Sequence, residues 1–373
     1  MSIAFARSSP GAAPQLHANH MLSDARSRGF VATKKAMQGV LSSRYLTPMW
    51  LSLSRQRVSI FVLHRFAMPQ LDLAGHEPAP LRRLFERLRR ERYKLFSLEE
   101  ACRRLGDGSG FPPASLVFTV DDGYCDFAEV AAPIFAAFDI PVTVFATTGF
   151  LDGTCWFWWD RIEYAICATR ARRLSIRTPD VTVHLDLGDG VNRSRTAMAL
   201  SEDLTGLSEA ARALFIDALS READVEIPAT APARYAAMTW DDARRLERQG
   251  VAFAPHTVTH PILPRTTDAD AAWQIPESWR SIQKQVARPL PIFAYPNGDY
   301  IPRDMDIVGR AGLTGAVTSR PGYVHVAQFD QPTGRFSIPR FPYPDYYPEA
   351  VCLTATGLTR VTAAARRAFS FLR

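Results

Sequence analysis

Two short segments of the sequence carry side chains that together could hold a metal ion. The adjacent carboxylates of Asp121 and Asp122 follow an apolar run, and His256 and His260 are separated by three residues. Neighbouring carboxylates at the end of a strand point to different sides, so they can have different functions. Two imidazoles and one carboxylate leave coordination positions open for water and substrate, which is typical of a catalytic metal site. The other carboxylate could then act as a base.

A predicted strand precedes each of these segments. Leu116–Val120 leads into the two aspartates, and Val251–Ala254 leads into the histidines. Active sites of α/β folds are built at the carboxyl ends of the strands, so the two segments can converge there. Pro255 and Pro261 flank the histidines and favour a loop or a single turn over a long helix.

Apolar runs alternate with amphipathic segments from residue 58 onwards, which predicts a mainly parallel sheet covered by helices. Both a barrel and a doubly wound sheet fit this α/β pattern. Ser97 and Glu100 form a capping box, and Thr239 caps a helix that Gly250 terminates. Further strands are expected at Val58–Leu63, Val142–Ala146, Pro291–Tyr295 and Gly315–Ser319, and further helices around 81–88, 127–138 and 303–311.

The alternation is interrupted between residues 155 and 235. This stretch holds Trp156, Trp158 and Trp159, a short β-like segment and a helix near 208–222, and we interpret it as an insertion on the rim of the domain. The expected organisation is therefore a basic N-terminal extension over 1–57, partly helical over 30–53, a domain over 58–345 that carries the insertion, and a basic C-terminal helix over 346–373.

Composition and charge exclude several classes of protein. With 373 residues, 47% of them hydrophobic and 22% charged, the chain is neither collagen-like, nor a disulfide scaffold, nor wholly disordered. The net charge of +6 comes from the ends: residues 1–57 carry +7 and residues 360–373 carry +4, whereas the rest carries −5. No nucleic-acid motif accompanies this charge, so no specific nucleic-acid partner is expected.

The location expected from the sequence is the cytoplasm. Five cysteines are irregularly spaced without a Cys-x-x-Cys pair, which favours reduced thiols. The first 30 residues lack the apolar run of a secretory signal, and no stretch of 18 apolar residues could span a membrane.

Several of these segments resemble the motifs of the polysaccharide deacetylases, also called NodB-homology or carbohydrate esterase family 4 enzymes. Thr119-Val120-Asp121-Asp122-Gly123 and His256-Thr257-Val258-Thr259-His260 resemble the first two motifs of the family. The likeness covers about 58–342 outside the insertion. It extends to Val62-Leu63-His64-Arg65, Ser97-Leu98-Glu99-Glu100, Ile140-Pro141-Val142-Thr143-Val144-Phe145 and Phe293-Ala294-Tyr295-Pro296-Asn297-Gly298.

The resemblance implies a distorted (β/α)7 barrel that removes an acetyl group from an N-acetylated sugar in a metal-dependent reaction. By position, Asp121 would be the general base. Asp122, His256 and His260 would bind the metal, usually Zn²⁺, with Co²⁺, Ni²⁺ or Mn²⁺ as the other candidates. The backbone N–H of Asn297 would contribute to the oxyanion hole.

The sequence departs from the family pattern at two catalytic positions. Ala294 stands where the family has the arginine that braces the base, and Arg340 or Arg65 could replace it. The late Leu-x-His motif that usually supplies the general acid is absent. His64 matches the acid histidine of the circularly permuted-type members, which sits in the first strand, and we expect it to be the acid.

The resemblance implies an N-acetylated saccharide as the substrate. The aromatic side chains that we expect to stack on its sugar rings are Tyr124, Tyr295 and Trp159, with Trp156 and Trp158 as further candidates. We favour a lipid-linked or oligosaccharide intermediate of surface-polysaccharide synthesis, because the basic ends suit docking on an anionic membrane face. Two alternatives stay open: hydrolysis of a C–N bond in a small non-sugar amide, and a catalytically silent module that only binds glycans.

Overall fold

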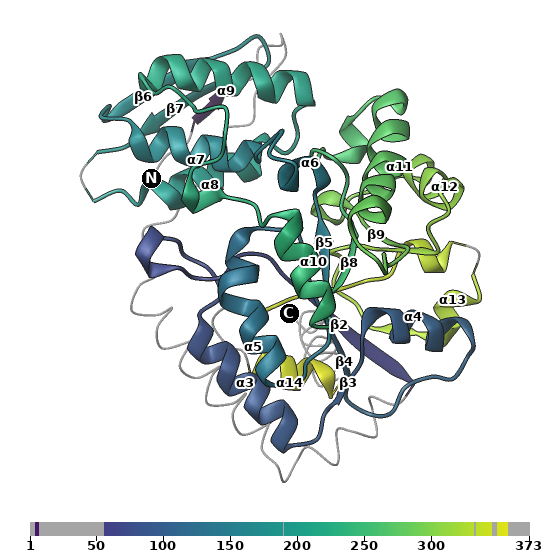
Figure 1. Cartoon of the computed structure of the whole chain (residues 1–373). Coiled ribbons are helices and arrows are strands. Elements are labelled where there is room, and N and C mark those ends of the chain that lie inside the picture. The colour runs from purple at the N-terminus through teal and green to yellow at the C-terminus, as the bar shows by residue number, and fades with distance from the viewer. Residues whose placement is uncertain (1–3, 7–55, 189, 332, 345–348, 357–373) are drawn as a thin grey trace, which may run out of the picture.

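The computed structural model describes residues 4–6, 56–188, 190–331, 333–344 and 349–356, and most of the apolar runs within them are strands of a curved, mainly parallel β-structure (Figure 1). Every residue of β4 (Ser115–Val120) and of β5 (Val142–Ala146) is buried. β4 pairs in parallel with β5 and with β2 (Arg57–Leu63). Strands that are buried on both faces, here by the surrounding helices and by the interior of the barrel, are almost continuously apolar, which is why the sequence pattern predicts them well.

Strands and helices alternate along the chain, as expected. Within the described residues, seven strands form the ring of the barrel: β2, β4, β5, β8 (Ala252–Pro255), β9 (Ile292–Ala294), β10 (Gly315–Val317) and β12 (Phe341–Pro342), with β3 (Lys94–Leu95) and β11 (Val324–His325) beside them. The surrounding helices are α3 (Pro78–Arg90), α4 (Leu98–Gly106), α5 (Ala132–Ala137), α6 (Thr148–Leu151), α10 (Trp240–Arg248), α11 (Asp268–Gln285), α12 (Pro302–Arg310), α13 (Val326–Phe329) and α14 (Ala350–Ala355).

The strands close into a distorted barrel. β2, β4, β5 and β8 are successive parallel neighbours, and β9 and β10 form a second parallel pair. Between these two groups the Leu290 N–H donates to the Phe253 carbonyl at 2.9 Å. A parallel bridge between Val317 and Ile338 leads from β10 towards β12, which pairs with β2. The predicted barrel is confirmed, and the doubly wound alternative is excluded.

The helices begin where the sequence places their caps. Ser97 Oγ accepts the Glu100 N–H at 3.1 Å at the start of α4. Thr239 and Asp242 form a reciprocal capping box at the start of α10. α3 covers the barrel with an apolar face whose residues recur every three or four positions, as an amphipathic helix requires. These buried residues are Leu81, Leu84, Phe85 and Leu88.

Residues 158–223 fold around a hydrophobic core of their own beside the barrel, at the upper left in Figure 1. Among the residues buried there are Ile162, Val183, Leu200 and Phe215. This layer consists of α7 (Trp158–Ala168), β6 (Arg173–Arg177), β7 (Thr182–Asp186), α8 (Arg193–Leu204) and α9 (Glu209–Ala223), with β1 (Ala4–Ala6) paired antiparallel to β7.

Several sequence predictions fall outside the described residues. They are the helix over 30–53, almost all of the extension over 1–57, and the predicted C-terminal helix beyond residue 356. In the part of the chain that the structure describes, no helix is long and apolar enough to cross a membrane.

Candidate functional site

Asp122, His256 and His260 meet at the carboxyl ends of β4 and β8. The Nε2 atoms of His256 and His260 lie 3.7 and 3.5 Å from Asp122 Oδ1, and all three side chains are buried. Each residue offers one ligand atom, and these atoms lie within 4.8 Å of one another. The histidines occupy a bent loop, because Thr257 has a φ of 65° and His260 a φ of 58°. This agrees with the expected loop and brings the two rings within 4.7 Å.

Unusual backbone conformations gather at this end of the barrel. Besides the two residues of the histidine loop, Asp122 has a φ of 76° and Asn297 a φ of 56°. Residues other than glycine rarely adopt positive φ, and such strain is typical of functional sites, where the surrounding structure has to maintain it. The backbone therefore turns sharply at each of these four positions, and all four lie at the carboxyl end of the barrel strands.

The two imidazole rings are oriented by different contacts. His256 Nδ1 donates to the Ala294 carbonyl at 2.8 Å, which leaves Nε2 free to bind a metal. His260 Nδ1 has no hydrogen-bond partner among the described residues. Its ring is instead packed edge-on against Trp159 and Phe157, with centroids 4.8 and 5.4 Å away. Aromatic packing thus takes the place of a hydrogen bond at His260.

The chemistry of the group fits a divalent metal ion. Burial, and then the neighbouring Asp121 carboxylate, raise the pKa of Asp122 well above its ordinary value. Burial lowers the pKa of both His256 and His260, so the imidazoles are neutral. A buried carboxylate facing two neutral nitrogens lacks a positive charge, and a cation would supply it. Two nitrogens and one oxygen suit Zn²⁺ and its neighbours in the transition series and leave positions open for other ligands.

Asp121 lies beside this group and is paired with a buried arginine. Arg340 Nη1 and Nη2 donate to its two carboxylate oxygens at 2.7 and 2.6 Å, and Arg340 is fully buried. Burial acts to raise the pKa of Asp121, but the charge and hydrogen bonds of Arg340 outweigh it, and the pKa falls to about 2. Arg340 also donates to Thr119 Oγ1 and to the Thr318 carbonyl, which fixes its position.

Of the two arginines left open by the sequence, Arg65 occupies a different place. Its Nε donates to Asp126 at 2.6 Å, and its guanidinium lies 3.7 Å above the ring of Tyr124. Arg65 therefore braces the wall of the site, whereas Arg340 contacts Asp121.

His64 follows β2, and its side chain is exposed to the cavity that contains the group. Burial lowers the pKa of His64 to about 4, and the negative charge of Asp121 acts in the opposite direction. His64 is thus a neutral imidazole at pH 7.

Asn297 lies on a tight turn (Pro296–Gly298) and lines the same cavity. Gly298 is required in this turn, since a Cβ there would lie 2.2 Å from the backbone nitrogen of Ser319. Tyr295, which we expected to contact sugar, is fully buried, and its hydroxyl donates to the Phe336 carbonyl. The strand directs this ring into the core, so the structure does not bring Tyr295 to the cavity.

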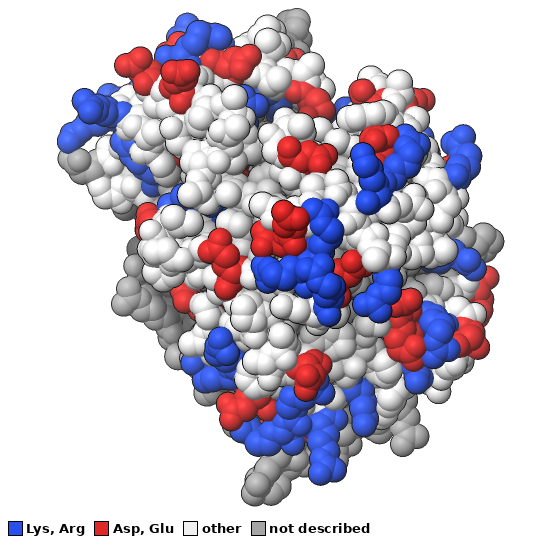
Figure 2. All heavy atoms as spheres, in the orientation of Figure 1, with Lys and Arg blue, Asp and Glu red and all other residues white. Residues whose placement is uncertain are grey.

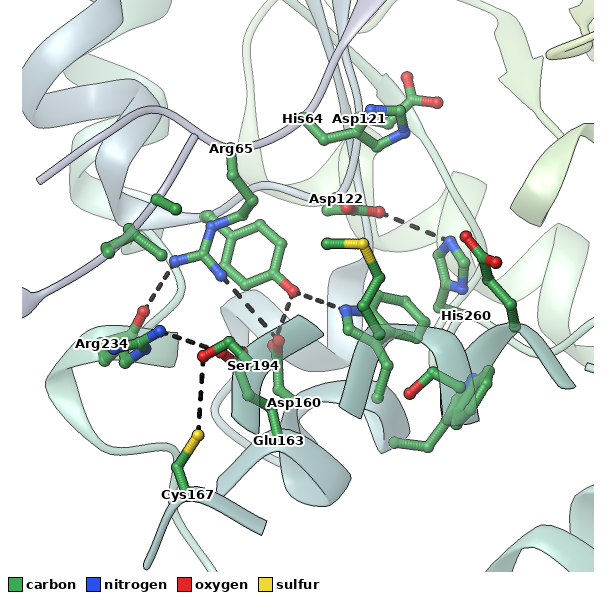
Figure 3. Close-up of a pocket in the computed structure, with 18 of the residues that line it drawn as sticks. His64, Arg65, Asp121, Asp122, Asp160, Glu163, Cys167, Ser194, Arg234 and His260 are labelled. Carbon is green, nitrogen blue, oxygen red and sulfur yellow. Dashed lines mark hydrogen bonds and ion pairs between the residues drawn. The ribbon is translucent and has the colours of Figure 1, made fainter. Parts of the chain in front are cut away.

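One cavity of about 1030 Å³ connects these residues (Figure 3). Among its walls are His64, Asp121, Asp122, His256, His260 and Asn297 from the barrel. Tyr124, Trp158 and Trp159 also line it, but Trp156 is buried elsewhere, where its Nε1 donates to the Pro228 carbonyl. The opposite wall comes from α7 and α8, which the sequence did not reveal.

A polar cluster in this wall was missed by sequence reasoning. Tyr124 donates its hydroxyl to Asp160 at 2.6 Å and accepts from Trp159 Nε1 at 3.1 Å. Burial raises the pKa of Asp160 to about 7, against the opposing charge of Arg65. The only available signal was the acidic residue directly after the paired tryptophans, which a surface helix would explain equally well.

Comparisons with known proteins agree with the geometry of the site. The family described as polysaccharide deacetylase matches residues 216–316, a segment that contains His256, His260 and Asn297. No curated protein matches the chain in sequence.

Several solved structures share the fold at low sequence identity. The deacetylase PplD of Streptococcus pyogenes, solved with acetate, is 18% identical, with a TM-score of 0.52 over 80% of this chain and 98% of its own. IcaB from Ammonifex degensii is 13% identical, with a TM-score of 0.51 over 81% and 97%. A polysaccharide deacetylase from Bacillus cereus is 14% identical, with a TM-score of 0.50 over 81% and 69%.

At such identities the likeness to solved structures establishes the fold alone, and it is the fold that the motifs led us to expect. The family match adds the segment that carries the two histidines. The resemblance of this chain to the polysaccharide deacetylase family is therefore confirmed, by the domain match and by the shared barrel.

Proposed function

We propose that this chain is a metal-dependent N-deacetylase that hydrolyses the N-acetyl group of an N-acetylhexosamine in a saccharide. One observation carries the proposal: the Asp122, His256 and His260 group shares a single cavity with Asp121, whose carboxylate is paired with the buried Arg340. A metal site and a separate ionised carboxylate are the two components that metal-assisted amide hydrolysis requires.

The residues divide the chemistry between them. A divalent ion held by Asp122, His256 and His260 would polarise the acetyl carbonyl and lower the pKa of bound water. Asp121 takes a proton from the water that attacks this carbonyl, because Arg340 holds its carboxylate in the ionised form. The backbone N–H of Asn297 donates to the oxygen that becomes negative in the transition state, an interaction of the kind that often dominates such catalysis.

His64 delivers a proton to the departing amine. Since burial lowers the pKa of His64 to about 4, its ring is neutral near pH 7. The proton therefore originates from the attacking water: Asp121 takes it and passes it on to His64, which returns Asp121 to its ionised form and gives the imidazole the proton that the amine receives. Without such a donor the tetrahedral intermediate would return to the amide.

The substrate that we favour is a lipid-linked saccharide or an oligosaccharide intermediate of surface-polysaccharide synthesis, met at the cytoplasmic face of a membrane. The basic ends of the chain, +7 over 1–57 and +4 over 360–373, support this choice because anionic lipid attracts them. Acetate release from free and from lipid-linked N-acetylhexosamine oligomers compares the two forms directly.

Acetate release by metal-free protein reloaded with Zn²⁺, Co²⁺, Ni²⁺ or Mn²⁺ tests the proposal. Asp121→Asn should keep the metal and lose about 10²–10⁴-fold in rate, as expected for a lost general base. His256→Ala should lose both metal and activity, whereas the exposed control Asp180→Asn should lose neither. Acetate release by Asp121→Asn at the wild-type rate would contradict the role of Asp121.

Two other results would replace the proposal. Hydrolysis of small cyclic amides without release of acetate from any saccharide would indicate the non-sugar amide hydrolase. Saccharide binding without acetate release under any metal would indicate a silent glycan-binding module.

A further inference from the structure

We propose that Asp160 of α7 is a positioning residue for His260, one of the two histidines of the metal-binding group. It acts through a chain of contacts formed by Tyr124 and Trp159. This inference rests on the metal site of the proposed function, and it makes the layer formed by residues 158–223 a part of that site.

The ring of His260 lacks the contact that usually fixes a metal-binding imidazole. Such a ring commonly donates its second N–H to a carboxylate, a backbone carbonyl or water. His256 follows this rule, since its Nδ1 donates to the Ala294 carbonyl at 2.8 Å. The Nδ1 of His260 has no hydrogen-bond partner among the described residues and is closed to solvent. The orientation of the His260 ring therefore depends on the side chains that pack against it.

Two aromatic rings at the start of α7 pack against His260. The ring centroid of Trp159 lies 4.8 Å from that of His260, with 76° between the ring planes. The centroid of Phe157 lies 5.4 Å from that of His260, with 75° between the planes. Trp159 and Phe157 are themselves stacked, with centroids 4.5 Å apart. A shift of the Trp159 indole would therefore open space into which the His260 ring can turn.

Hydrogen bonds connect Trp159 to Asp160 by way of Tyr124. Trp159 Nε1 donates to the Tyr124 hydroxyl at 3.1 Å, and that hydroxyl donates to Asp160 Oδ2 at 2.6 Å. An indole N–H can only donate, so the hydroxyl accepts from it and directs its own hydrogen to Asp160. Asp160 serves in either charge state, because a protonated carboxyl group keeps an accepting oxygen. Removal of this acceptor would leave the buried hydroxyl of Tyr124 unpaired, which is costly.

Asp160 is itself held in place from two sides. The following turns of α7 are buried in the core of the layer through Ile162 and Ile166. On the barrel side, Arg65 Nη1 lies 4.0 Å from Asp160 Oδ1 (Figure 3). Arg65 is fixed in turn by its hydrogen bond to Asp126 at 2.6 Å. The buried Asp160 is therefore a firm point to which the indole of Trp159 is tied.

Chelator competition for Zn²⁺ on the full chain tests the proposal without relying on activity. Tyr124→Phe, which removes the link, should reduce the Zn²⁺ affinity by about tenfold, the lower end of the usual effect of losing a group that orients metal ligands. Asp160→Leu should lose a similar factor. Asp160→Asn keeps an accepting oxygen and should stay within about twofold of wild type. The double variant Tyr124→Phe/Asp160→Leu should bind like Tyr124→Phe alone, because substitutions within one chain of contacts are not additive.

Two substitutions outside the chain of contacts are matched controls. Tyr164→Phe, on α7 but off the cavity, and Asp217→Leu, exposed on α9, should both bind Zn²⁺ as wild type does. With Co²⁺ as the probe, the visible absorption bands report how the ligands are arranged. Wild type and Asp160→Asn should share one Co²⁺ spectrum, whereas Tyr124→Phe should show shifted bands because the His260 ring can turn.

Four results would each overturn the positioning role. They are wild-type Zn²⁺ affinity in Tyr124→Phe, an Asp160→Asn variant as weak as Asp160→Leu, a double variant that loses the product of the two single losses, and one Co²⁺ spectrum for all variants. Should circular dichroism show that Asp160→Leu does not fold, Asp160→Ala takes its place.

Acetate release is measured separately on the same variants. A wild type that binds Zn²⁺ and shows the expected pattern of affinities, but releases no acetate from any saccharide, would refute the proposed function and still support the role of Asp160. A wild type that binds neither Zn²⁺ nor Co²⁺ would overturn both.

Discussion

At the scale of single residues, the Asp121–Arg340 pair has the largest energetic consequence. Both side chains are almost completely inaccessible to solvent, and they share two hydrogen bonds. A buried ion pair of this kind adds little net stability, but removal of one partner leaves an isolated charge in the core. The pair therefore constrains which substitutions the site tolerates.

Arg340→Leu should destabilise the protein by about 3–5 kcal/mol, because it leaves the Asp121 carboxylate buried without a partner. Urea unfolding monitored by circular dichroism measures the change. The double variant Asp121→Asn/Arg340→Leu is the control, and it should recover a large part of the loss since no charge remains. A single variant as stable as wild type would show that water reaches Asp121 freely.

The same pair predicts a dependence of stability on pH. The pKa of Asp121 is lowered to about 2 in the folded protein, from about 3.9 in an unfolded chain. Its contribution, about 2–3 kcal/mol, is therefore complete above about pH 4 and is lost as the pH falls through the folded-state pKa. The difference in unfolding free energy between wild type and Asp121→Asn should shrink by this amount between pH 5 and pH 2. A constant difference would contradict the lowered pKa.

At the scale of elements, the loop that carries the two histidines is held by α11. Gln274, buried on α11, accepts the N–H groups of Val258 and Thr259 with its Oε1 at 2.8 and 3.0 Å. Its Nε2 donates to Thr259 Oγ1 at 2.7 Å. On the other side of the loop, the N–H of Gly149 donates to the Val258 carbonyl. The loop can keep its positive φ angles because both sides hold it.

Gln274→Met should reduce the affinity for Zn²⁺ by about 10–100-fold, the usual effect of losing a group that orients metal ligands. Chelator competition measures this affinity independently of activity. Gln274→Glu, which keeps the acceptor for both N–H groups, should lose less than Gln274→Met. Trp273→Ala, on the exposed side of α11, is the matched control and should bind as wild type does. Equal affinity in Gln274→Met and wild type would remove α11 from the metal site.

At the scale of the whole molecule, the charge of the body differs from that of its ends. On the face shown in Figure 2, basic and acidic side chains are interspersed, and α10 carries the pairs Arg244–Asp241 and Arg245–Asp242. The positive charge of the chain is concentrated at residues 1–57 and 360–373. This separation is what a peripheral contact with an anionic membrane would use.

Sedimentation with liposomes tests the membrane contact. The full chain should bind vesicles that contain anionic lipid and not neutral ones, since each Lys or Arg near the surface contributes about 1 kcal/mol. Replacement of the eight Lys and Arg of residues 1–57 by Gln should weaken binding strongly, and added salt should have the same effect. Equal binding to neutral and anionic vesicles would exclude an electrostatic membrane contact.

Much of the barrel was predictable from local sequence. The strands around 58–63, 116–120 and 142–146 are apolar because helices cover the outer face of the barrel and the inner face packs in its interior, and the caps at Ser97 and Thr239 are local signals. α7, α8 and α11 were not predicted. α11 contains Pro276 within its span, and α8 mixes small and polar residues on its buried side, so neither shows a clear helical pattern.

The sequence by itself identified Asp122, His256 and His260 as a candidate metal-binding group, because these residues follow apolar strands whose ends meet at one edge of a parallel sheet. Only the tertiary structure decided which arginine contacts Asp121, since Arg340 lies 219 residues away and reaches it through closure of the barrel. It also decided that Tyr295 is in the core and that α8 forms the far wall of the cavity. Contacts between distant segments depend on how the elements pack, and local sequence patterns do not record that packing.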